Sequence, residues 1–104
     1  MIINISFKGM EASENIQRVI ERKTQDLKHH LNKPCKIDWI CENHNGLRKC
    51  KTTLISPYKT IETESTNNSI YNSIDKVIEK IRYQVLNKDQ EQKKTLKFEH
   101  VFSS

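Results

Sequence analysis

The fold is decided by residues 37–54, which read IDWICENHNGLRKCKTTL. The apolar residues Ile37, Trp39 and Cys41 recur at every second position, the pattern of a β-strand with one buried face. Asn45 and Gly46 then form the dipeptide preferred in a two-residue type I′ hairpin turn. With these two residues as the loop, the inward-facing residues form three pairs, Cys41 with Cys50, Trp39 with Thr52 and Ile37 with Leu54.

A third strand follows this hairpin. Matching Leu54 to Ile61 sets its register and places the corner at Pro57 and Tyr58. Because Pro57 cannot adopt the positive φ of a primed turn, we expect a different or longer turn there. The outward positions carry mixed charges typical of a solvated sheet face: Lys49, Lys51, Glu42, Glu62 and Glu64.

The remaining elements flank these strands. Alternating apolar residues predict a first strand over about residues 2–7, which Gly9 ends. Ser13 can cap a helix over about residues 14–31. After a polar turn at residues 66–68, apolar residues at helical spacing predict a second helix from Ile70 to about Asn87.

This order, β-α-β-β-β-α, predicts an α+β fold. A right-handed crossover makes the first two strands parallel, and two hairpins complete a four-stranded mixed sheet with both helices on one face. The arrangement resembles a double-stranded-RNA-binding-like fold. We expect residues 1–88 to form one α/β domain and residues 89–104, rich in Lys, Gln and Glu, to form a flexible C-terminal tail.

Composition narrows the class of function. The formal net charge of +5 permits an anionic partner, nucleic acid being the commonest. The sequence contains neither a membrane-span pattern nor the apolar core of a signal peptide, so we expect a cytoplasmic protein without membrane contact.

The three cysteines lack the paired spacing of metal ligands, and nothing suggests secretion, so the sequence favours neither a disulfide framework nor a metal site. Cys41 and Cys50 are most simply core residues, with a cross-strand disulfide as the alternative.

Catalysis is not expected. The only glycines are Gly9 and Gly46, and neither opens a phosphate-binding loop of the kind that an acylphosphatase-like enzyme would need. No nucleophile, base and oxyanion donors form a recognisable set. We therefore expect no cofactor and no small-molecule substrate.

Several short motifs, in this order and spacing, resemble the ribosome hibernation-promoting factor family, which includes the ribosome-associated translation inhibitors. The resemblance covers about residues 1–88. It rests on the following positions: Asn4-Ile5-Ser6, Ser13-Glu14, Lys23, Leu27, Ile70-Tyr71, Ile74-Asp75, Glu79-Lys80-Ile81 and Gln84.

The resemblance implies a protein that binds the small ribosomal subunit and its rRNA at the decoding region. There it would block mRNA and tRNA binding and inhibit translation in stationary phase or under stress, by occupancy and without chemistry. The chain is similar to a short family member, without the additional dimerisation domain, and we expect it to be monomeric when free. It departs from the family pattern at Asp26, Tyr83 and Asn87, where basic residues are usual.

The helices are the expected platform for rRNA, because phosphate binding requires exposed Lys and Arg side chains. Arg18, Arg22, Gln25 and His29 follow one stripe of the first helix, and Lys76, Lys80, Tyr83 and Asn87 follow one of the second. We expect Tyr83 to stack on a base, Tyr71 to lie at the edge of the core and Trp39 to lie within the core. The predicted rRNA-binding residues are Arg18, Arg22, Lys23, Lys28, Lys76, Lys80, Arg82, Tyr83 and Lys88.

Three alternatives stay open at this point. The helix charges could simply be solubilising, offset by the acidic residues beside them. A double-stranded RNA-binding module acting off the ribosome would contain the same α-β-β-β-α order, although the extra first strand disfavours it. An oligomerising partner protein would expose a contiguous apolar patch, which the sequence does not indicate outside the tail.

Overall fold

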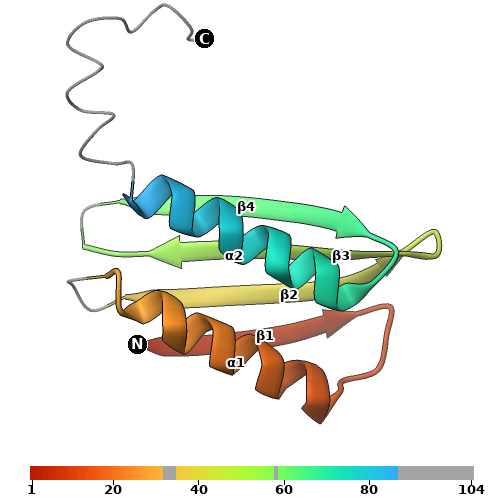
Figure 1. Cartoon of the computed structure of the whole chain (residues 1–104). Helices are drawn as coiled ribbons and strands as arrows, with labels where there is room; N and C mark the ends of the chain where they lie inside the picture. Colours follow the sequence, from red (N-terminus) through yellow and green to blue (C-terminus); the bar gives the residue numbers. More distant parts are fainter. Residues whose placement is uncertain (32–34, 58, 87–104) are drawn as a thin grey trace, which may run out of the picture.

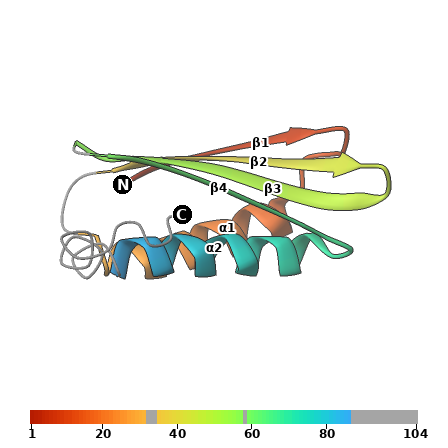
Figure 2. The ribbon, with the colours of Figure 1, turned by 90° about the horizontal axis from the view of Figure 1, so that it is seen from above.

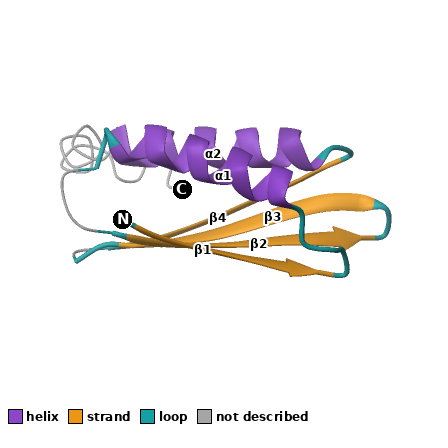
Figure 3. Cartoon of the chain, turned by 90° about the horizontal axis from the view of Figure 1, so that it is seen from below, coloured by secondary structure: helices purple, strands orange, loops and turns teal. Residues whose placement is uncertain are grey.

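The computed structural model describes residues 1–31, 35–57 and 59–86 of the chain. Its elements are, in order, β1 (Ile2–Lys8), α1 (Glu14–Lys28), β2 (Lys36–His44), β3 (Leu47–Ile55), β4 (Thr60–Asn67) and α2 (Ile70–Leu86). The strands form one sheet in the order β1-β2-β3-β4, with β1 parallel to β2 and the other pairs antiparallel (Figure 1). The two helices form a second layer on one face (Figures 2 and 3). The predicted α+β fold is therefore confirmed.

The β2–β3 hairpin has the predicted register. Cys41 lies opposite Cys50, Trp39 opposite Thr52 and Ile37 opposite Leu54. The turn residues Asn45 and Gly46 have φ values of 53° and 82°. Positive φ at both positions defines the primed turn and explains why Asn and Gly occupy them.

The β3–β4 corner is tight. Leu54 pairs with Ile61, as predicted. The Ser56 amide donates to the Lys59 carbonyl at 2.9 Å, and the Lys59 amide donates back to the Ser56 carbonyl at 3.4 Å. The corner therefore closes between Ser56 and Lys59, and Tyr58 lies outside the described residues.

Helix α1 begins where Ser13 predicts and ends earlier than expected. The Ser13 hydroxyl accepts a hydrogen bond from the Ile16 amide at 3.2 Å. The predicted end near residue 31 is wrong, because the amides of His29, His30 and Leu31 donate to carbonyls three residues earlier. Such bonds tighten the last turn and end the regular α-helix at Lys28. Helix α2 ends at Leu86, and the expected tail lies outside the described residues.

The core lies between the sheet and the helix layer. Trp39 is 1% exposed, which confirms its predicted burial, and it shares the core with Ile20 and Leu27 of α1 and Ile74 of α2. A buried polar contact also ties the layers together. The Ser73 hydroxyl donates to the Arg48 carbonyl at 2.7 Å, and this bond fixes the start of α2 against β3.

Candidate nucleic-acid interface

The outer stripe of α1 is exposed as predicted. Arg18, Arg22, Gln25 and His29 all face solvent, because Ile16, Ile20, Thr24 and Leu27 take the opposite side into the core. The Arg18 guanidinium lies 3.4 Å from the Glu14 carboxylate, and both side chains are largely exposed. Within the described part of the chain, Arg22 forms no ion pair. Its guanidinium is therefore available to an anion.

The basic stripe of α2 lies on the flank that overhangs β4. Lys80 Nζ donates to the backbone carbonyl of Glu64 at 2.7 Å, and Lys76 Nζ lies 3.4 Å from the Glu79 carboxylate. Tyr83 is 63% exposed and lines a shallow hollow together with Lys80. This flank therefore presents an aromatic ring beside an ammonium group, the combination that favours stacking on a nucleobase next to a phosphate.

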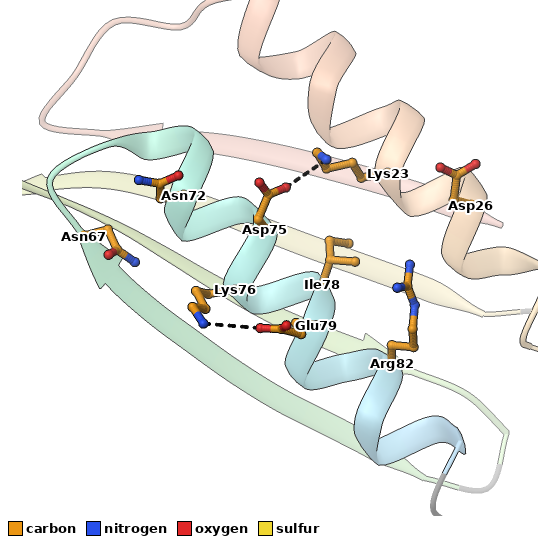
Figure 4. Close-up of a pocket in the computed structure, with 9 residues that line it drawn as sticks. All are labelled: Lys23, Asp26, Asn67, Asn72, Asp75, Lys76, Ile78, Glu79 and Arg82. Atoms are coloured by element: carbon orange, nitrogen blue, oxygen red, sulfur yellow. Dashed lines mark hydrogen bonds and ion pairs between the residues drawn. The ribbon is translucent and has the colours of Figure 1, made fainter.

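A groove of about 490 Å³ extends from the space between the two helices across α2 to the end of β4 (Figure 4). Lys23 of α1 crosses it to Asp75 of α2 at 2.8 Å, the ion pair drawn in the figure. Arg82 extends from α2 towards α1, on the side where Asp26 lies (Figure 4). The groove is lined by Lys23, Asp26, Asn67, Asn72, Asp75, Lys76, Ile78, Glu79 and Arg82. Three cations thus face three carboxylates, so the groove itself is close to neutral.

The predicted site residues are only partly brought together. Lys23, Lys76 and Arg82 line the groove, whereas Arg18 and Arg22 lie on the outer side of α1, where they line a separate hollow. Lys80 and Tyr83 lie on the β4 flank. Lys28 is exposed at the end of α1, and Lys88 lies outside the described residues. The two stripes therefore flank the groove and do not merge into one continuous basic patch.

Sequence reasoning missed some of the groove residues. Asn72 and Asn67 bring amide groups to the lining, and neither was singled out from the sequence. Asn72 stands one helical turn before Lys76, so helical spacing contained a signal for it. Asn67 comes from β4, and nothing in the local pattern connects it with α1.

The open face of the sheet is electrically balanced. Its alternate positions carry four lysines and four carboxylates, which are Lys8, Lys36, Lys49, Lys51, Asp38, Glu42, Glu62 and Glu64. Lys49 lies 3.5 Å from the Glu64 carboxylate. Such pairs are typical of a solvated sheet face, so the helix layer remains the better candidate for an anion.

The cysteine pair belongs to the core. Cys41 and Cys50 are fully buried and lie opposite each other. A hydrogen bond from the Cys50 thiol lowers the pKa of Cys41, and the same bond, together with burial, raises the pKa of Cys50. Over the described ranges, no group of three or more His, Cys, Asp or Glu side chains is placed to hold a metal ion.

The sheet and the helix layer on one of its faces define a small two-layer α+β domain. The family model described as "Sigma 54 modulation protein / S30EA ribosomal protein" matches residues 3–93. The chain therefore belongs to this family, whose members are ribosome-associated factors and not enzymes.

Solved structures share the fold. The N-terminal domain of Protein Y from Thermus thermophilus superposes with a TM-score of 0.77 at 16% identity, over 82% of this chain and 96% of that chain. A ribosomal subunit interface protein from Coxiella burnetii superposes with a TM-score of 0.73 at 20% identity, over 86% of this chain and 99% of that chain. Among curated proteins, none matches the sequence significantly. No helix in the described ranges combines the length and apolarity needed to cross a membrane.

Proposed function

We propose that this protein is a ribosome hibernation factor. It binds the small ribosomal subunit at the decoding region, blocks mRNA and tRNA binding, and so inhibits translation in stationary phase or under stress. It acts by occupancy, in the cytoplasm, and is monomeric when free. Residues 1–88 are the ribosome-binding domain, and residues 89–104 are a flexible tail.

The observation that carries this proposal is the charged surface of the helix layer in a chain of this family. Arg22 faces solvent from the outer side of α1 without an ion pair to any described residue, and Lys23 and Arg82 line the separate groove between α1 and α2. Guanidinium and ammonium groups held on rigid helices bind rRNA phosphates through charge and released counterions. Tyr83, exposed on the other flank, adds a stacking surface.

Co-sedimentation tests the proposal. Purified protein is mixed with isolated small or large ribosomal subunits and centrifuged through sucrose at low and moderate salt. We expect selective pelleting with the small subunit and a steep loss of binding as salt rises. Equal binding to free double-stranded RNA would favour an RNA-binding module that acts off the ribosome. No association with either would overturn the proposal.

A further inference from the structure

The two outer edges of the sheet are protected to different degrees against pairing with an additional strand. β4 carries the charged residues Glu62 and Glu64, and Lys80 Nζ donates a hydrogen bond to the Glu64 carbonyl. Charges of this kind keep other strands from pairing with an exposed edge. β1 ends the sheet on the other side, and Lys8 at its end is its only charged residue. The edge of β1 is therefore the less guarded of the two.

The backbone of β1 offers a regular set of hydrogen-bonding groups on that edge. The Ile2 amide donates to the Cys35 carbonyl at 3.2 Å, and Ile2 pairs with Lys36 of β2. Because the backbone groups of successive residues in a strand point to opposite sides, the N–H and C=O of Ile3, Ile5 and Phe7 point away from β2. Within the described part of the chain, no further strand pairs with them.

A groove lies beside the start of this edge, along the outer side of α1. Figure 1 shows α1 running obliquely across β1, so that its first turns lie outside the outer edge of the strand. The groove measures about 430 Å³ and is lined by Met1, Ile3, Arg18, Glu21, Arg22 and Gln25. The side chains of Ile3, Ile5 and Phe7 pack against the core but are only partly buried. Apolar surface is thus left for an incoming residue to cover.

We propose that the β1 edge binds an extended peptide segment of a partner protein, which adds as a fifth strand beneath α1. Backbone bonds to Ile3, Ile5 and Phe7 supply the pairing, as in other cases of strand addition. Of the two guanidinium groups in the lining, that of Arg18 is paired with Glu14 and that of Arg22 forms no ion pair with a described residue. Arg22 can therefore pair with an incoming carboxylate, so the segment alternates apolar residues with acidic ones. A second copy of this chain fits less well, because its own α1 would have to occupy the space under the overhanging helix. This site goes beyond the proposed function and shares Arg18 and Arg22 with the proposed rRNA-binding surface.

The test uses the full chain, labelled with ¹⁵N, and a blocked peptide of four Val-Glu repeats. We expect the peptide to slow hydrogen exchange at the amides of Ile3, Ile5 and Phe7, whereas Asn4 and Ser6 change little because their amides already face β2. A peptide of four Val-Lys repeats is the matched control and should bind more weakly.

Two variants sharpen the result. Arg22→Glu should weaken binding of the Val-Glu peptide roughly fivefold through the lost charge pairing. Ile5→Pro removes one outward amide at an edge position that tolerates proline and should abolish strand addition. Lys80→Ala, at the opposite edge, should leave peptide binding unchanged.

Several results would overturn the proposal. One is the absence of protection at millimolar peptide, and another is protection at β4 instead of β1. Protection that depends on protein concentration without peptide would identify a second copy as the occupant. Protection already present in the full chain and lost on deletion of residues 89–104 would identify the chain's own tail.

Discussion

Lys23 Nζ lies 2.8 Å from Asp75 Oδ1, and this ion pair joins α1 to α2 across the groove between them. The two side chains are 32% and 55% exposed, so solvent screens the pair and its contribution to folding is below about 1 kcal/mol. Its larger effect is on charge. Asp75 neutralises a lysine that would otherwise be available to an rRNA phosphate.

Asp75→Asn should therefore strengthen ribosome binding. The substitution frees Lys23 and leaves the groove with one more cation than carboxylates, which favours phosphate contacts. We expect tighter binding to the small subunit and a steeper salt dependence, measured by filter binding at several salt concentrations. Weaker binding would mean that the ion pair positions Lys23 for its contact.

Arg22→Glu combined with Lys80→Glu should weaken binding to the small subunit by at least tenfold. Each substitution replaces a candidate phosphate contact with a like charge on the helix layer. The matched control is Lys36→Glu, an exposed lysine on the open sheet face, which should bind as the unmodified protein does. Circular dichroism checks that all variants fold. Equal binding by the double variant would exclude the helix surface.

Tyr83→Ala should cost about 1–3 kcal/mol of binding free energy if the ring stacks on a base. Tyr83→Phe keeps the aromatic face and should retain most of the affinity, so the pair separates stacking from hydrogen bonding by the hydroxyl. Titration with small subunits measures both variants. An equal loss for the two would assign the effect to the hydroxyl.

Ser73→Ala should destabilise the fold by about 1–2 kcal/mol. It leaves the Arg48 carbonyl without the hydrogen bond that Ser73 donates at 2.7 Å, in a place where the Ser73 side chain is fully buried. Urea denaturation gives the free energy of unfolding. Ser6→Ala, on the open sheet face, is the control and should stay within about 0.5 kcal/mol. Equal stability of both variants would show that water replaces the lost contact.

Local chemistry made much of the fold predictable. The Asn45-Gly46 pair requires a primed turn, and a two-residue loop leaves one register, so the pairing of Cys41 with Cys50 follows from neighbouring residues alone. The exposure of Arg18 and Arg22 followed in the same way from the helical spacing of the buried residues. The end of α1 was missed, because bonds from His29 to Leu31 tighten the last turn without a distinct sequence signal.

The sequence by itself determined the order of the elements, the hairpin register and the exposed stripes of each helix, because these depend on spacing along the chain. Only the tertiary structure decided how the stripes lie relative to one another. Lys23 meets Asp75 because α1 packs beside α2, and Lys80 reaches the Glu64 carbonyl because α2 lies over β4. Such contacts join residues far apart in sequence, and the packing angle of two helices on a twisted sheet sets them.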